Sequence, residues 1–471
     1  MSISIQKIAA AAVDANHGRP MPPLLKGWPL VGVLPSLLRD PFGFALGAWQ
    51  RDGDIFTLDL GFTTMVFLCH PRHAQHLLRD NAANYHKGGA LWAAIRNVLG
   101  NGLVVSEGDF WLRQRRLMQP QFHRQRLAGL TTYMVEAIDE ALRTWEEPAR
   151  AGRPFNVAEP FNALTMRGVL KTLFGAGLQP QEMDRVGAEM AFLFTYFFVD
   201  AATAALPRWL PLPGRRRYQE ALALFDQIVY QVIRTSRAEI GPENHLLAML
   251  LNTVDEETGA QMNDRQLRDE IATLFVAGFE TTSLALSWAV HYLTQYPAVL
   301  QKLQEEVDRV LDGRTPTFAD LPNLTYTRMV LQETLRIAPP SYWTPRTALA
   351  GDEIDGYHIP AGANVVSFTY AIHRHPDHWP DAERFDPERF TPENSTGRDH
   401  FAWIPFGAGN RQCIGRDFAL MEGQLALAML VQRYQLSALP GQRVQPALSG
   451  TLRPKGGVTV QLARRVSYCG G

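Results

Sequence analysis

The chain has 471 residues, of which 46% are hydrophobic, and its 46 basic residues nearly balance its 47 acidic ones. This composition is typical of a globular protein with a large core, and it excludes a disordered chain or one that coats nucleic acid. The three cysteines cannot all pair in disulfides, which favours a reducing compartment.

The N-terminal residues 1–20 contain one early apolar run, from Ile8 to Val13, which is too short to span a membrane. We therefore expect a flexible N-terminal segment, no membrane anchor and a cytoplasmic protein. The proline-rich stretch from Pro20 to Pro23 then indicates an extended path into the folded part.

Two strand-like runs come first, Asp54 to Leu60 and Thr64 to Cys69, with a turn at Gly61 and Phe62. Beyond Pro71 the apolar residues recur at helical spacing, which predicts a mostly helical chain. The clearest such stretches are Phe110 to Arg116, Leu130 to Trp145 and Ala163 to Phe174.

A candidate capping box, Asn263 to Gln266, opens a helical pattern that continues to Pro297. A helix of that length would measure about 50 Å and would cross a whole domain. Gly278, Thr281 and Thr282 lower the helix propensity in the middle of this helix, which predicts a widened or kinked turn. The same small residues would also suit close helix packing.

After Leu335 the pattern changes to short β-type runs, followed by a helix after Cys413 and a predicted hairpin around Pro454 to Gly457. The β-type runs are Gly356 to Pro360 and Asn364 to Tyr370, and the helix is Arg416 to Tyr434. The elements together predict a mainly α fold with a minor β region, in a single domain over residues 1–471.

The most informative segment is the glycine-rich loop from Phe406 to Gly415, which places Cys413 just before a helix. Its glycines allow a tight bend and a close approach to a flat partner. Backbone N–H groups at a helix N-terminus stabilise a thiolate, which is what a cysteine ligand to haem iron must be. An inert buried cysteine is the alternative.

This loop resembles the haem-ligand loop of the cytochrome P450 superfamily, because F-G-x-G-x-R-x-C-x-G is matched at every fixed position. The resemblance extends from about Pro22 to Leu462. It implies the cytochrome P450 fold, a single large helical domain around a buried haem b, with the Cys413 thiolate as axial ligand. It also implies that Phe406 and Gly415 contact the cofactor.

The stretch from Ala277 to Thr282 resembles the oxygen-binding segment of that family, A/G-G-x-D/E-T. The resemblance implies that Thr281 hydrogen-bonds dioxygen and that Glu280 belongs to the path of proton delivery. The chemistry is reasonable, since a hydroxyl can relay a proton and a carboxyl can supply one. Helix packing alone remains the alternative for this stretch.

Glu333 and Arg336 lie three residues apart on one helix face with apolar flanks, so we expect a buried pair. The segment from Pro387 to Phe390 resembles the family segment whose arginine, here Arg389, completes a triad. We expect the three side chains to hold the region of the Cys413 loop and to touch no substrate.

Haem propionates need cationic or hydrogen-bonding partners. By the resemblance, Trp111, Arg115, Arg346 and Arg411 take this role, and His86 is a further candidate. For each arginine, an ordinary surface charge is the alternative.

The segments that line the substrate pocket in the family are apolar and aromatic here, which predicts a fatty acid, terpenoid, steroid or polyketide as substrate. Some of these side chains are expected to belong to the core instead. The candidate pocket residues are Leu91, Trp92, Leu103, Phe194, Phe197, Leu274, Ala277, Tyr342, Trp343 and Leu452.

The resemblance implies a haem-thiolate monooxygenase that inserts one atom of O2 into a C–H or C=C bond of this apolar substrate. We expect no fused reductase, a monomer, and electrons from a separate ferredoxin or flavodoxin with its reductase. A basic cluster would steer that partner, and an ordinary solvated face is the alternative. The cluster consists of Arg113, Arg116, Arg124, Arg126 and Arg416. A peroxide-driven haem-thiolate enzyme and a haem-based gas or redox sensor are the alternative functions.

Overall fold

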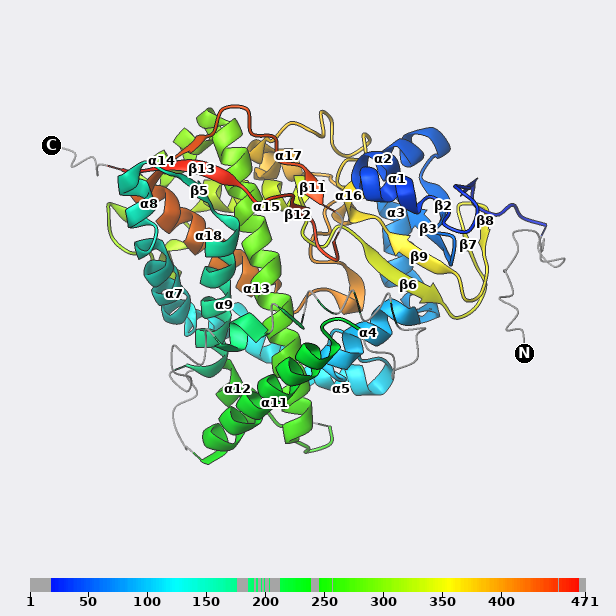
Figure 1. Cartoon of the computed structure of the whole chain (residues 1–471), viewed down its shortest axis with the longest axis horizontal. Coiled ribbons are helices and arrows are strands. Elements are labelled where there is room, and N and C mark those ends of the chain that lie inside the picture. Colours follow the sequence, from blue (N-terminus) through cyan, green and yellow to red (C-terminus); the bar gives the residue numbers. More distant parts are fainter. Residues whose placement is uncertain are drawn as a thin grey trace. The chain divides into compact units, whose positions relative to one another are not determined.

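The computed structural model describes residues 18–175, 185–189, 212–238, 245–255, 257–447 and 449–465, together with residues 192, 193, 196, 199 and 203. Figure 1 shows the chain. Two compact units can be distinguished in it. The first consists of Met1–His86, Trp343–His375 and Asp399–Arg411, and the second of Lys87–Tyr342, Pro376–Arg398 and Gln412–Gly471.

A six-stranded sheet forms the centre of the first unit, in the order β1-β2-β3-β9-β6-β4. The predicted hairpin is confirmed, with Ile55 of β2 opposite Leu68 of β3. Strand β3 pairs in parallel with β9, and β9 is antiparallel to β6. The strands are β1 (Leu24–Leu25), β2 (Ile55–Asp59), β3 (Thr64–Leu68), β4 (Tyr85–His86), β6 (Thr344–Ala348) and β9 (Asn364–Ser367).

Short helices and a second hairpin complete the first unit, whose apolar core includes Ile55, Leu68, Val365, Ile372 and Ile404. The hairpin, β7 (Asp352–Ile354) with β8 (Tyr357–Ile359), agrees with the β-type run predicted there. The helices are α1 (Leu34–Arg39), α2 (Pro41–Asp52), α3 (Pro71–Gln75) and α16 (Thr369–Ile372), and a π-helical turn spans His76–Asp80.

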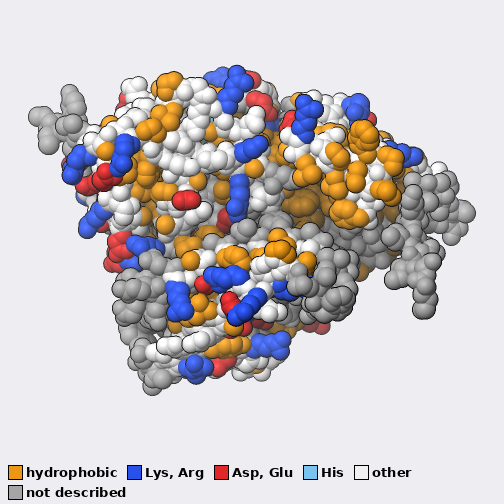
Figure 2. Space-filling view, viewed as in Figure 1, with side chains coloured by type: hydrophobic (Ala, Val, Ile, Leu, Met, Phe, Trp, Pro, Cys, Tyr) orange, Lys and Arg blue, Asp and Glu red, His pale blue; other side chains and the backbone are white. Residues whose placement is uncertain are grey.

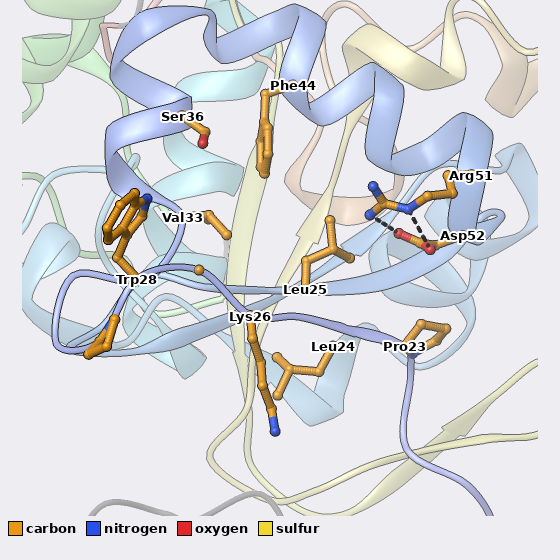
Figure 3. A pocket seen from close by; sticks show the side chains of 12 residues that line it. Pro23, Leu24, Leu25, Lys26, Trp28, Val33, Ser36, Phe44, Arg51 and Asp52 are labelled. Carbon is orange, nitrogen blue, oxygen red and sulfur yellow. Dashed lines mark hydrogen bonds and ion pairs between the residues drawn. The ribbon is translucent and has the colours of Figure 1, made fainter.

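The first unit also exposes large apolar side chains, among them Trp28 (70% exposed), Leu30 (86%) and Phe62 (80%). Figure 2 shows hydrophobic side chains gathered over the part of the surface where Figure 1 places α1 and α2. A cavity of 690 Å³ opens there, lined by the segment Pro23–Pro29, by α1 and α2, and by the Arg51–Asp52 ion pair (Figure 3). Its lining residues differ from those predicted to bind a cofactor.

The second unit is mainly helical, and its longest helix is α13 (Asp264–Gln295). Helix α13 contacts α9, α11, α15, α18 and α4. The other helices of the described residues are α4 (Gly89–Leu99), α5 (Gly108–Met118), α6 (Arg124–Ala128), α7 (Thr131–Arg143), α8 (Glu146–Ala151), α9 (Ala158–Phe174), α11 (Arg215–Ala238), α12 (Leu246–Asn252), α14 (Pro297–Leu311), α15 (Thr325–Ile337), α17 (Pro392–Ser395) and α18 (Arg416–Arg433). The predicted helices therefore form, and the mainly α fold with a minor β region is confirmed.

The predicted capping box starts α13, because the Asn263 side chain accepts from the Gln266 N–H at 2.9 Å and the Gln266 side chain accepts from the Asn263 N–H at 2.9 Å. By length and composition, with a mean hydropathy of 1.3 over its most apolar window, α13 could cross a membrane. However, 72% of that window is buried inside the protein, as in the core helix of a globular domain.

Helix α13, which the structure describes over its full length, continues as α-helix through Gly278–Thr282, without the widened turn that these residues predict. The Thr281 hydroxyl donates to the Ala277 carbonyl (2.9 Å) and the Thr282 hydroxyl to the Gly278 carbonyl (3.2 Å). A Cβ at Gly278 would lie 2.9 Å from Val169 of α9, so this glycine does allow close helix packing.

A three-stranded sheet, β10-β13-β5, closes the C-terminal part of the second unit. The chain turns at Pro454 to Gly457, but the hairpin predicted there is wrong. Strand β12 pairs with β11, whereas β13 pairs with β10 and β5. The strands are β5 (Pro154–Asn156), β10 (Tyr434–Ala438), β11 (Pro446–Ala447), β12 (Arg453–Pro454) and β13 (Thr459–Arg464).

Candidate active site

Cys413 lies between the 3-10 turn Gly409–Arg411 and α18, and its side chain is exposed. Desolvation by the surrounding protein raises the pKa of its thiol, whereas the Gly415 N–H and the guanidinium groups of Arg115 and Arg416 act to lower it. An accessible sulfur beside a backbone N–H and two cations is the donor set that a thiolate metal ligand needs. The residues therefore fit a haem-thiolate site.

Arg115 ties α5 to the residue that precedes this cysteine. Its Nη1 donates to the Gln412 carbonyl at 2.9 Å, and its Nε donates to Gln119 at 3.0 Å. Burial lowers the pKa of Arg115, and the nearby Cys413 acts to raise it. Trp111, one turn earlier on α5, is half-buried. The structure thus brings Arg115 to the Cys413 loop, whereas its role toward a propionate remains a prediction.

Four of the predicted cofactor residues lie in the first unit. Arg346 on β6 is 8% exposed and donates to the Pro345 carbonyl at 2.8 Å. The Nδ1 of His86 on β4 lies 3.0 Å from the Thr347 carbonyl oxygen, which makes that nitrogen the donor. The Phe406 ring packs edge-on against Trp403. Arg411, at the end of the 3-10 turn, is half-buried.

A glycine is required just before Arg411. Gly409 has φ +66°, and a Cβ there would lie 2.0 Å from the Leu78 carbonyl oxygen. Both the backbone angle and the close approach therefore exclude larger residues at this position. Gly409 is thus required by the close packing of the loop against the turn His76–Asp80.

An accessible face runs along the otherwise buried middle of α13. Leu274, Ala277, Gly278 and Thr281 are half-buried or exposed, whereas the residues from Thr282 to Val290 are all buried. The spacing of three and four residues places the accessible positions on one side of the helix. Three predicted site residues, Leu274, Ala277 and Thr281, therefore share one face.

Glu280 is held by the C-terminal part of the chain rather than by its helix neighbours. It is 3% exposed, and its Oε1 accepts from the Thr451 hydroxyl (2.9 Å) and from Arg453 Nη2. Burial raises the pKa of Glu280, while Arg453 and Thr451 act to lower it. The sequence analysis missed both partners, and the available signal was the pair of polar residues Thr451 and Arg453 on either side of Leu452.

Glu333, Arg336 and Arg389 come together as the sequence indicates. Arg336 donates twice to the Glu333 carboxylate, at 2.7 and 2.8 Å, and both side chains are fully buried. The Asp386 N–H donates to Glu333 at 2.9 Å, and Arg389 Nε lies 3.5 Å from it. Arg389 also donates to two carbonyls of the 380–381 segment. A buried pair that gains such further partners joins α15 to the segment 380–390.

The candidate pocket residues divide between surface and core. Leu103 and Leu452 are buried, and the Leu452 carbonyl accepts from the indole N–H of Trp288 at 2.9 Å. The Tyr342 hydroxyl donates to the Ser449 carbonyl at 2.7 Å. Leu91 and Trp92 of α4 and Trp343 of the first unit are half-buried, and Phe194 and Phe197 lie outside the described residues.

The sequence analysis also missed Glu422, a fully buried residue of α18. Neither of its carboxyl oxygens has a hydrogen-bond partner among the described residues. Burial raises the pKa of Glu422 to about 8, with the nearby Thr282 hydroxyl acting to lower it. The signal in the sequence was an acidic residue inside an apolar helical run.

The predicted basic cluster is partly neutralised. Arg116 forms ion pairs with Asp255 (3.3 Å) and Glu257, and Arg416 forms one with Asp417 (3.2 Å). The guanidinium groups of Arg113 and Arg124 lie over the rings of Phe110 and Phe318. Arg126 on α6 is exposed.

The fold and the cysteine loop define a haem-thiolate class of protein, and comparison with known proteins identifies the family. The family model of cytochrome P450 matches residues 22–462. The chain therefore belongs to the cytochrome P450 family, whose members bind haem through a thiolate, and it is a monooxygenase.

The curated relatives include proteins from Streptomyces. The chain is 36% identical to cyclooctat-9-en-7-ol 5-monooxygenase of Streptomyces melanosporofaciens over 88% of this chain and 89% of the relative. It is 31% identical to pentalenene oxygenase of Streptomyces avermitilis over 90% and 93%. Among solved structures, the haem domain of cytochrome P450DA is 28% identical, with a TM-score of 0.87 over 96% of this chain and 99% of that one.

Proposed function

We propose that this protein is a haem-thiolate monooxygenase in which Cys413 is the axial ligand of haem b and the substrate is a terpenoid. The observation that carries the proposal is the surroundings of Cys413. Cys413 is an exposed residue beside the Gly415 N–H, Arg115 and Arg416, which favour the thiolate and oppose the desolvation that raises the pKa of the thiol. Arg115 further holds the backbone directly before the cysteine.

When bound, haem supplies the activation of O2 and the transfer of one oxygen atom to a C–H or C=C bond. The chain's own residues have to exclude water, orient the substrate and deliver protons. Thr281 is suited to the delivery of protons, since its hydroxyl lies on the accessible face of α13. Glu280 lies one residue away, and burial raises its pKa, so its carboxyl is suited to supply a proton.

The substrate class rests on two supports. The accessible face of α13 presents Leu274 and Ala277, which favour an apolar molecule over a charged one. The relatives named above act on cyclooctat-9-en-7-ol and pentalenene, according to their names. A cyclic terpene or its alcohol is therefore the first substrate to test.

The electrons are proposed to come from a separate ferredoxin or flavodoxin and its reductase, with the protein acting in the cytoplasm as a monomer. The cofactor contacts proposed for the first unit are those of Arg346, Arg411, His86 and Phe406, and Trp111 is proposed to act together with Arg115. Exposed cations of the basic cluster, such as Arg126, would attract an acidic electron donor.

The carbon monoxide difference spectrum of the dithionite-reduced protein tests the proposal. A strongly red-shifted Soret band is expected for haem iron bound opposite a thiolate, and Cys413→Ser should abolish it. A band at the position of histidine-ligated haem in the native protein would contradict the assignment of Cys413. Terpenes can then be screened by the change in spin state that a bound substrate causes.

A further inference from the structure

Three consecutive ionisable residues, Arg268, Asp269 and Glu270, lie buried in the N-terminal part of α13. Their exposed fractions are 7%, 7% and 1%. Charged side chains are almost never buried to this extent unless they are paired. The chemistry proposed above does not use these residues, so their contacts indicate what they do.

The two carboxylates bind the loop that follows α4. Asp269 accepts from the Asn101 N–H and Glu270 from the Leu103 N–H, each at 2.9 Å. Burial raises the pKa of Glu270 to about 8, with the Leu103 N–H acting to lower it and the Asp269 charge acting to raise it. Two backbone N–H groups of one short loop are therefore held by two neighbouring side chains of α13.

Arg268 extends this contact to two more helices. Its Nη1 donates to the Val98 carbonyl of α4 (3.0 Å) and to Asp269 (3.1 Å), and its Nε donates to Asp226 of α11 (2.7 Å). One guanidinium thus connects α4, α11 and α13. Asp226 is 41% exposed, so this end of the network reaches the surface.

Two glycines bring the loop into direct contact with α13. A Cβ at Gly100, which has φ +61°, would lie 2.0 Å from Asp269 Oδ1. A Cβ at Gly102 would lie 2.1 Å from the Thr273 hydroxyl oxygen. The loop is therefore fitted to this part of the helix, and a larger residue at either position would push it away.

The position of the loop relates it to the accessible face of α13. Glu270 and Leu274 are four residues apart and therefore lie on the same side of the helix. Because Leu103 is bonded to Glu270, its backbone lies at the N-terminal end of the face that contains Leu274, Ala277 and Thr281. Buried ionic networks add little net stability compared with apolar packing, so their use here points to a requirement for geometry.

We propose that Arg268, Asp269 and Glu270 form a clamp that fixes the loop 100–103 against α13 and thereby sets the size of the molecule that reaches the accessible face. The three are positioning residues, since they act through the loop and through Leu103. The second part of the inference rests on the proposed function, because it treats this face as the substrate side of a haem protein.

The experiment uses the holoenzyme and a series of clamp variants. Asp269→Ala and Glu270→Ala remove the acceptors, whereas Asp269→Asn and Glu270→Gln keep an uncharged acceptor and should restore part of the effect. Gly102→Ala displaces the loop while all three ionisable side chains remain, and its φ adds no backbone strain. Glu305→Gln is the control, because Glu305 is exposed and accepts only from Gln301 of its own helix among the bonds of the described residues.

Hydrogen exchange at the Asn101 and Leu103 amides gives the first readout. Loss of the hydrogen bond to the carboxyl group should speed exchange about tenfold or more in the alanine variants and less in the Asn and Gln variants. The second readout is the association rate of imidazole and of the larger phenylimidazole with ferric haem, followed by the Soret shift. We expect the rate for phenylimidazole to rise severalfold relative to that for imidazole, in Gly102→Ala as well.

Two results would overturn the inference. If the Asn101 and Leu103 amides exchange as slowly in the Asp269→Ala and Glu270→Ala variants as in Glu305→Gln, the two carboxyl groups do not hold the loop. If exchange is faster in these variants but the ratio of the phenylimidazole and imidazole association rates is unchanged, the contact is structural and does not control the size of the molecule that enters. Exchange reports on the clamp whether or not haem is thiolate-bound, so a failed carbon monoxide spectrum would contradict the proposed function separately.

Discussion

Glu280 of α13 and Arg453 of β12 form an ion pair across 173 residues of sequence. The carboxylate is buried and the arginine is 41% exposed, so the pair joins the interior of the second unit to its surface. The Thr451 hydroxyl is a second donor to the same carboxylate oxygen. A carboxylate next to Thr281 is therefore fixed by the C-terminal segment of the chain.

Replacement of Arg453 should lower the free energy of unfolding more than replacement of Glu280. Arg453→Gln leaves Glu280 as a buried charge with one donor, whereas Glu280→Gln leaves a half-exposed arginine that water can solvate. We expect Arg453→Gln to be the more destabilising at neutral pH by about 1–2 kcal/mol, a value reduced from that of a fully buried pair because of the exposure of Arg453. Unfolding in urea measures the difference.

The pH dependence of this difference follows from the sign of the pKa shift. Loss of Arg453 raises the pKa of Glu280 further above its ordinary value, so the variant loses stability as the pH rises through that raised pKa. The deficit should therefore shrink as the pH falls and the carboxyl of Glu280 becomes protonated. Lys302→Gln, which breaks an exposed pair with Glu388, should change little over the same pH range. A deficit that grows on acidification would contradict the assignment.

The role proposed for Thr281 can be separated from helix packing by a neighbouring threonine. Thr281 and Thr282 both donate to the carbonyl four residues earlier, but Thr281 is accessible and Thr282 is buried. Thr281→Ala should divert electrons from product to peroxide, because the hydroxyl that relays protons is lost. The yield of peroxide per electron pair, with a surrogate ferredoxin and a terpene that shifts the spin state, measures this effect. Equal uncoupling in Thr282→Ala would assign the effect to packing.

The arginines of the basic cluster should contribute unequally to the attraction of the electron donor. Arg116 is neutralised by Asp255 and Glu257, whereas Arg126 is exposed on α6. Arg126→Gln is therefore expected to slow reduction by an acidic ferredoxin severalfold at low salt, and Arg116→Gln to slow it less. Stopped-flow reduction at low and high ionic strength checks this, since screening should remove the difference. A larger effect of Arg116→Gln would place the docking site near Arg116 instead of Arg126.

Local patterns allowed much of the fold to be predicted from the sequence. The capping box at Asn263 and the strands that meet at Gly61 depend on residues a few positions apart, and both are confirmed. The pair of Glu333 and Arg336 follows from helical spacing, and the glycine loop before Cys413 follows from its motif. The capping box, the hairpin and the Glu333–Arg336 pair depend on contacts within one element or one turn, whereas Gly409 of the loop packs against the distant Leu78 carbonyl.

Contacts between distant segments could not be predicted from the sequence. The hairpin predicted at Pro454 to Gly457 is wrong because β13 finds its partners in β10 and in β5, far along the chain. The bond of Glu280 to Arg453 and that of Glu270 to Leu103 likewise join segments that no local pattern relates. Long-range contacts depend on how the helices pack, and a single sequence does not specify that packing to side-chain accuracy.

Glu422 should make the stability of the protein decrease with rising pH. Its pKa of about 8 lies well above the ordinary value of 4.5, so the folded protein binds an extra proton between these two values. Stability is then highest at low pH in this window and is lost as the pH rises through about 8.

In Glu422→Gln, a neutral side chain of similar size replaces the carboxyl and this loss should disappear. We expect native and variant proteins to be nearly equal in stability near pH 5, and the variant to be more stable by about 1–4 kcal/mol near pH 9. Urea unfolding at the two pH values, with the exposed Glu305→Gln as control, measures the effect. A variant that is less stable at the higher pH would show that Glu422 is ionised and paired in the folded protein.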